Sequence, residues 1–65
     1  MFMIGSVMFV ESEDKDFTWD AYRWDSTEPI AWIAVTSIDV EVHTRVSIEH
    51  YSTLDEAARA IEQYP

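Results

Sequence analysis

Residues 30–48 read IAWIAVTSIDVEVHTRVSI, and the even-numbered positions of this stretch are apolar with few exceptions. Alternation with a period of two residues is typical of a β-strand that buries one face. Nearly twenty residues are too many for one ordinary strand, because strands usually end after three to about ten residues. The stretch therefore predicts two strands joined by a hairpin turn.

The position of that turn must come from strand register, because the stretch contains no glycine to mark it. A three-residue loop at 43–45 pairs Val42 with Val46 and keeps the apolar side chains on one face, whereas a two-residue loop there would bury polar residues. A three-residue loop at 37–39 keeps the same parity, with a shorter strand before it and a longer one after it. The sequence leaves these two three-residue loops open.

The N-terminal half predicts two further strands. Met1–Val10 is a continuous apolar run that ends in a charged turn, Glu11–Asp16, which is typical of a strand covered on both faces. Phe17–Trp24 alternates between apolar and polar residues and predicts a half-buried strand. The segment 25–29, which ends in proline, predicts a loop.

The C-terminal segment predicts a helix over Leu54–Tyr64. Thr53 and Glu56 have the spacing of a capping box, in which a threonine hydroxyl receives the N–H group three residues later. Apolar residues then recur at helical spacing on one stripe: Leu54, Ala57, Ala58 and Ile61. The predicted fold is a single α+β domain, residues 1–65, with a four-stranded antiparallel sheet (a β-β-β-β-α meander) and one amphipathic C-terminal helix on one face.

The chain is strongly acidic, with thirteen Asp and Glu against four Lys and Arg among 65 residues. This excess of negative charge creates an electrostatic field that repels nucleic acid and membrane headgroups and attracts basic protein surfaces. The densest acidity lies between the two uncharged runs 1–10 and 29–38. We name these residues the acidic belt and predict that they bind protein: Glu11, Glu13, Asp14, Asp16, Asp20, Asp25 and Glu28.

The expected function is that of a small acidic, non-catalytic protein-binding module. By analogy in size and charge alone, it compares with phage-type inhibitors, DNA-mimic and anti-CRISPR proteins among them, that occupy a basic nucleic-acid-binding surface of a host protein. The alternative is a small homodimeric structural or assembly domain whose acidity reflects a high-salt environment. Direct nucleic-acid binding is not expected, because the sequence offers no basic groove.

A homodimer is expected because one helix covers one face of a sheet, while the two uncharged runs are apolar on both faces. Closed twofold dimers are the commonest way to cover such a face. The predicted dimer interface consists of Met1, Met3, Val7, Phe9, Ala31, Ile33 and Val35.

Catalytic and cofactor sites are not expected. The chain has no cysteine and one glycine, so it lacks thiolate ligands and a glycine-rich phosphate loop. Asp39, Glu41 and His43 share one strand face with Glu49 on the probable neighbouring strand, but His50 has the opposite parity. The turn could change the facing of His50. One histidine beside carboxylates on a strand is nevertheless typical of a solvated face, so no metal site is predicted.

Membrane insertion is not expected either. The run Met1–Val10 lacks a positively charged leader and a small-residue cleavage site, and it has about half the length that a membrane-spanning helix needs. We therefore expect this run to belong to the folded domain, and by elimination we expect a cytoplasmic location.

Overall fold

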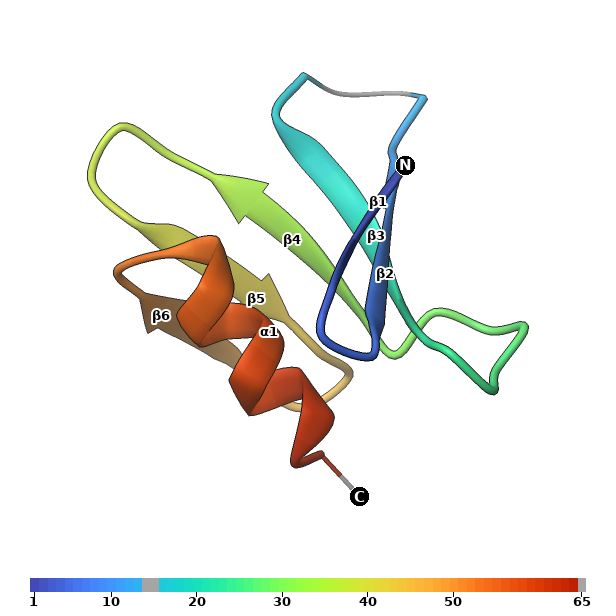
Figure 1. Ribbon diagram of the computed structural model, residues 1–65. Helices are drawn as coiled ribbons and strands as arrows, with labels where there is room; N and C mark the ends of the chain where they lie inside the picture. The colour runs from blue at the N-terminus through green and yellow to red at the C-terminus, as the bar shows by residue number, and fades with distance from the viewer. Residues whose placement is uncertain (14–15, 65) are drawn as a thin grey trace.

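The computed structural model describes residues 1–13 and 16–64, which form an antiparallel sheet with one helix after it (Figure 1). The α+β class and the C-terminal helix agree with the sequence, but the sheet has six strands instead of the expected four. The strands follow one another in chain order across the sheet. The elements are β1 (Phe2–Ile4), β2 (Val7–Glu11), β3 (Thr18–Arg23), β4 (Ala31–Val35), β5 (Val40–His43), β6 (Ile48–Tyr51) and α1 (Leu54–Glu62).

The first extra strand arises because the run Met1–Val10 is divided at a tight turn. Gly5 has a φ of +59°, a left-handed conformation that glycine adopts without steric cost, and Ser6 completes the two-residue loop between β1 and β2. Phe2 pairs with Phe9 across this hairpin. The prediction of one continuous strand is wrong, because it overlooked the glycine as a turn residue.

The second extra strand arises because both candidate turns in the stretch 30–48 are present. Val35 pairs with Val40 and His43 pairs with Ile48, so each loop has four residues. Both three-residue loops that the sequence left open, 43–45 and 37–39, are therefore wrong in length, and so is the pairing of Val42 with Val46. An even-numbered loop reverses the parity of the residues that face the core.

The two four-residue loops, 36–39 and 44–47, share one hydrogen-bond pattern. In the first, the Thr36 backbone N–H donates to the Asp39 carbonyl at 2.9 Å, and the Thr36 hydroxyl accepts from the Asp39 N–H at 3.0 Å. In the second, Thr44 makes the same two contacts with Ser47, at 2.9 and 3.1 Å. The threonine side chain replaces the backbone partners that a tight turn would provide.

Helix α1 begins where the sequence predicts. Thr53 is the N-cap residue, with extended backbone angles, and its hydroxyl accepts from the Glu56 N–H at 3.1 Å. The helix ends at Glu62, two residues before the predicted end. Within the described residues, no helix has the length and apolarity that a membrane crossing requires.

The sheet curves around this helix. Helix α1 contacts β2, β5 and β6, and β2 is separated from β5 in the sheet by β3 and β4. Figure 1 shows the two halves of the sheet on either side of α1. One face of the sheet is therefore closed by the helix, and we call the opposite side the open face.

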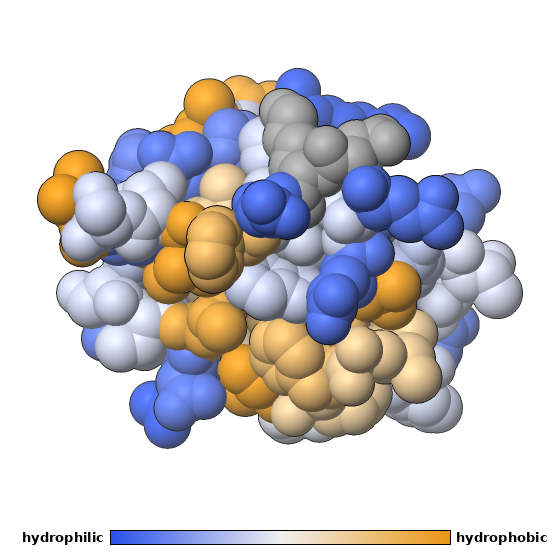
Figure 2. All heavy atoms as spheres, turned by 90° about the horizontal axis from the view of Figure 1, so that it is seen from above, coloured by the Kyte–Doolittle hydropathy of each residue, from blue (hydrophilic) through white to orange (hydrophobic). Residues whose placement is uncertain are grey.

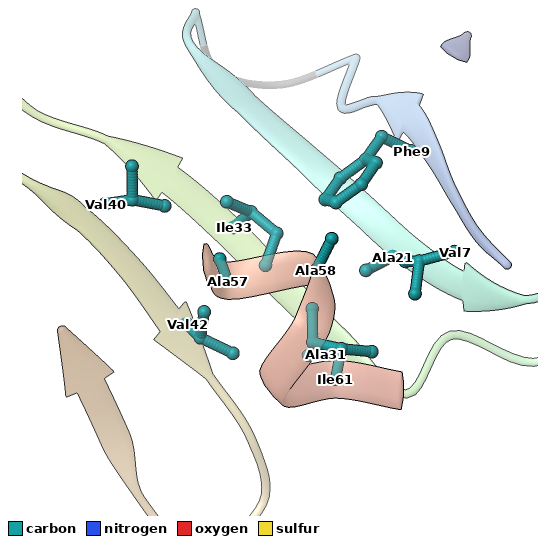
Figure 3. Packing of buried hydrophobic residues seen from close by; sticks show 10 residues of the cluster. All are labelled: Val7, Phe9, Ala21, Ala31, Ile33, Val40, Val42, Ala57, Ala58 and Ile61. Carbon is teal, nitrogen blue, oxygen red and sulfur yellow. The ribbon is translucent and has the colours of Figure 1, made fainter. Parts of the chain in front are cut away.

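The core lies between α1 and the curved sheet. Its fully buried side chains come from both halves of the sheet and from the helix stripe, and they point toward one another (Figure 3). The predicted helix stripe is confirmed, since Ala57, Ala58 and Ile61 are buried and Leu54 packs against the core. The buried apolar residues are Val7, Phe9, Ala21, Ala31, Ile33, Val40, Val42, Ala57, Ala58 and Ile61.

The β1–β2 turn is hydrogen-bonded to the end of α1 through Glu62. Both the backbone N–H and the hydroxyl of Ser6 donate to Glu62 Oε2, at 3.1 and 2.7 Å. The hydroxyl contact and then the backbone contact hold the pKa of the Glu62 carboxyl below its ordinary value. A carboxyl with a lowered pKa in the folded state stabilises the fold above its unfolded-state pKa, and this contribution disappears as the pH falls through the folded-state pKa.

We therefore expect Glu62→Gln to flatten the acid limb of the stability curve. Thermal unfolding of both proteins, measured at steps downward from neutral pH, should show a smaller fall of Tm in the variant once the pH passes the ordinary carboxyl range. Glu13→Gln, which changes an exposed carboxyl before β3 and far from α1, is the charge-matched control. Parallel acid limbs for Glu62→Gln and the original protein would contradict the role of the Ser6 contacts.

Candidate functional site

The open face is formed by side chains from all six strands. Residues that are paired directly across antiparallel strands lie on the same side of a sheet, so the observed registers assign each side chain to one face. The residues of the open face are Met3, Met8, Val10, Thr18, Asp20, Tyr22, Trp32, Ala34, Glu41, His43, Ile48 and His50.

An aromatic pair occupies the middle of this face. The rings of Trp32 and His43 stack with their centroids 3.7 Å apart and their planes inclined by 11°. The ring of His43 is also held by a contact of 3.0 Å between its Nε2 and Glu41 Oε1. Stacking and hydrogen bonding together fix a flat aromatic platform, which can bind another molecule with little loss of side-chain entropy.

Apolar area is exposed around the platform. Trp32 is 38% exposed, and Met3 and Ile48 near the two edges of the sheet are 53% and 57% exposed. Large apolar and aromatic side chains that remain accessible on one face are typical of interfaces. The open face therefore has the composition of a binding surface.

The aspartate and glutamate side chains of the strands give the open face its charge. Asp20 pairs with Trp32 across the strands, and Glu41 lies next to His43 on the same face. All strand residues are described, and Arg23 is the sole lysine or arginine among them. Arg23 pairs with Val7, which lies in the core, so its side chain belongs to the helix-covered face. The strands thus place carboxylates and no lysine or arginine on the open face.

A hollow of about 260 Å³ adjoins the platform. Its lining includes Asp20, Pro29, Trp32, His43 and Arg45. A second hollow, of about 390 Å³, lies on the other side of Ile30 and Arg45 and reaches Tyr64. The first hollow extends the open face and gives the aromatic platform an adjacent recess.

The acidic belt is not one continuous surface. Glu11, Glu13 and Asp16 are exposed at the β2–β3 end of the sheet, whereas Asp25 and Glu28 are exposed in the loop after β3, at the opposite end. Six residues of strand separate the two groups by roughly 20 Å. Asp20 lies between them on the open face, and Asp14 lies outside the described residues.

Figure 2 views the molecule from the end that carries the β2–β3 loop. Hydrophilic residues at this end are interspersed with hydrophobic ones. The acidity is therefore distributed over both ends of the sheet and its open face.

The predicted dimer interface is divided between the two faces. Val7, Phe9, Ala31 and Ile33 are buried in the core under α1, so they are not available to a partner. Val35 also belongs to the helix-covered face, because it pairs with Val40. The predicted interface is therefore wrong for these five residues. The turn at Gly5 reverses the facing of β2, and of the seven residues Met1 and Met3 are exposed.

A cluster of histidine and carboxylate side chains lies at one corner of the open face. Nδ1 of His50 is 2.8 Å from Asp39 Oδ2, and His50 pairs with Glu41 across β5 and β6. The parity of the extended run predicts His50 on the opposite face and leaves open whether the turn changes its facing. The four-residue loop 44–47 turns His50 to the same side as Glu41, and the repeated Thr-x-Ile/Val pattern of the two loops was the missed signal.

Glu49 lies on the helix-covered face and does not join this cluster. Its Oε2 accepts hydrogen bonds from the hydroxyls of Tyr51 and Tyr64, at 2.8 and 3.2 Å. Burial first, and then the hydrogen bond to Glu49, raise the pKa of the Tyr51 phenol far above its ordinary value. The phenols therefore stay protonated near neutral pH and tie β6 to the end of α1.

No family model matches this sequence, and no curated protein or solved structure shows significant similarity to it.

Proposed function

We propose that this protein is a small non-catalytic binding module whose open face docks on a basic surface of another protein. The observation that carries the proposal is the composition of that face. It combines exposed apolar and aromatic side chains with carboxylates, and the strands contribute no lysine or arginine to it. A cationic surface with apolar side chains among its charges is the complementary partner.

The aromatic centre of the open face and the carboxylates beside it contribute to this binding in different ways. Trp32 and the adjoining hollow provide a place where a partner side chain can be desolvated, and such buried aromatic contacts carry most of the energy of an interface. Asp20 and Glu41 beside it favour Lys or Arg on the partner. The net charge of −9 accelerates the encounter with a basic surface.

Basic surfaces that bind nucleic acid fit this description best. A protein that covers such a surface with carboxylates competes with phosphate groups for the same lysines and arginines. The proposed activity is therefore that of an inhibitor that displaces nucleic acid from its binding protein, as phage-type DNA-mimic and anti-CRISPR proteins do.

The test is capture from host lysate with matched variants. Trp32→Ala and Asp20→Lys change the open face, and Glu56→Lys makes the same charge reversal on the far side of α1. We expect the original protein and Glu56→Lys to retain partners that elute at high salt and are displaced by added DNA, and we expect the two open-face variants to lose them. Equal capture by all four proteins would overturn the proposal.

Charge reversal between β2 and β3 tests whether acidic residues outside the open face also attract the partner. The pair Asp14→Lys and Asp16→Lys is expected to slow capture at low salt. The unfolding midpoint should stay unchanged, because an exposed charge such as that of Asp16 contributes about 0–1 kcal/mol per pair to stability. If the rate of association with the partner at low salt is unchanged, these acidic residues contribute to solubility and not to binding.

The second candidate function is a homodimeric structural domain adapted to high salt, and the exposed apolar area of the open face favours it. The two proposals predict opposite effects of salt. Salt screens the repulsion between two chains of charge −9 and would strengthen a homodimer, whereas it weakens a complex with a basic partner. Sedimentation at micromolar concentration separates them, since a monomer at both low and high salt excludes the homodimer.

A further inference from the structure

We propose that Asp39, Glu41 and His50 form a binding site for one divalent transition-metal ion of the zinc type. The three side chains offer two carboxylate oxygens and one imidazole nitrogen, and these ligand atoms all lie within 4.8 Å of one another. The site shares Glu41 with the proposed docking surface, but it concerns what this chain binds by itself, so metal titration of the isolated protein tests it separately.

The backbone explains why the three ligands converge. Asp39 directly precedes β5 and Glu41 lies two residues later, within the strand, so their side chains project on the same side. His50 is the cross-strand neighbour of Glu41 on β6. Zinc binds nitrogen and oxygen ligands at about 2.0–2.2 Å, which places ligand atoms roughly 3.4 Å apart around a tetrahedral ion. His50, whose side chain is 55% exposed, has the freedom to make the remaining adjustment.

Both carboxylates are oriented by neighbours outside the ligand set. The Thr36 hydroxyl donates to Asp39 Oδ1 at 3.0 Å, which leaves Oδ2 directed at His50. His43 contacts Glu41 Oε1 at 3.0 Å and is itself fixed against Trp32. Such outer contacts are characteristic of metal sites, where they hold each ligand in its binding orientation.

The local charge favours a cation. The side chains of Asp39 and Glu41 are only 22% and 29% exposed, and each lies within hydrogen-bond distance of a histidine ring nitrogen. A divalent ion would neutralise both carboxylates. The imidazole nitrogen selects a transition metal over Mg²⁺ and Ca²⁺, which prefer oxygen ligands alone. The three protein ligands leave a fourth position for water or for a group from another molecule.

The experiment is a titration of the untagged, chelator-treated protein with Zn²⁺ by calorimetry and with Co²⁺ by visible absorption. We expect one ion per chain, with the absorption bands of a low-coordinate Co²⁺ site, and no comparable binding of Mg²⁺. Loss of an outer contact of a metal ligand typically weakens metal binding about 10–100-fold. Glu41→Gln and His50→Ala remove ligands themselves, so each should weaken Zn²⁺ binding by at least that factor. Glu28→Gln, which removes one charge from a distant loop, should bind as the original protein does.

Folding of each variant is checked by its unfolding midpoint without metal, and in the original protein the His50 ring resonances should shift on addition of Zn²⁺. The proposal is overturned if the original protein does not bind Zn²⁺, if the His50 resonances do not respond, or if binding weakens equally in Glu28→Gln. Equal affinity for Mg²⁺ would also overturn it, because a general attraction to acidic charge would then explain the binding.

Discussion

Replacement of Ile61 by alanine is expected to destabilise the fold by about 2–5 kcal/mol. Ile61 is fully buried at the last turn of α1, where it points into the core between the two halves of the sheet (Figure 3). The substitution removes three methyl or methylene groups and leaves a cavity that the curved sheet cannot close without losing its other contacts. A domain of 65 residues has a small reserve of stability, so the variant should be largely unfolded near room temperature.

Urea denaturation measures this effect, and two companion variants calibrate it. Ile61→Val should lose about 0.5–1.5 kcal/mol, because only one methylene group is removed. Arg59→Ala, on the exposed side of the same helix, should change stability by about 0.5 kcal/mol or less. A loss below about 0.5 kcal/mol for Ile61→Ala would mean that α1 does not pack on the sheet through this residue.

The parts of the fold that the sequence predicted correctly depend on local signals. The threonine cap and the apolar stripe of α1 lie within one stretch of about ten residues, so propensity and periodicity determine them together. The facing of β3 is likewise fixed by its own alternation, which places Trp19 and Ala21 toward the helix and Asp20 and Tyr22 on the open face.

The hairpins were harder to predict from the sequence, because the position of each turn depended on one loop residue. The sole glycine, at position 5, is followed by serine, a pair that is typical of a two-residue hairpin loop. Thr36 and Thr44 begin loops in which the side chain supplies the turn contacts, so no glycine is needed. Both signals were readable in the sequence, but the apolar alternation favoured longer strands.

These errors in turn position assigned several residues to the wrong face of the sheet. A strand that shifts by one residue exchanges its two faces, so the turn at Gly5 moved Val7 and Phe9 into the core. The even-numbered loop before β6 moved His50 to the face of Glu41 in the same way. The open face and the histidine–carboxylate cluster could therefore be recognised only once the strand registers were known.

The substitution Phe9→Ala tests the most consequential of these registers, and we expect it to destabilise the fold by about 3–5 kcal/mol. Phe9 is fully buried, and its ring stacks on that of Phe2 with a centroid distance of 5.0 Å. Phe2 in turn contacts the ring of Trp19 edge-on at 6.0 Å. Loss of Phe9 thus removes both a large buried side chain and the inner member of an aromatic cluster.

The neighbouring residue provides the matched control. Met8 lies on the open face, so Met8→Ala should change the stability of the isolated chain by about 1 kcal/mol or less. If Phe9 instead lay in a dimer interface, as its sequence position first suggested, the effect of Phe9→Ala would depend on protein concentration and would disappear on dilution to monomers. Urea denaturation at two concentrations a hundredfold apart distinguishes the cases. A concentration-independent loss for Phe9→Ala, with little change for Met8→Ala, places Phe9 in the core and leaves the open face available to a partner.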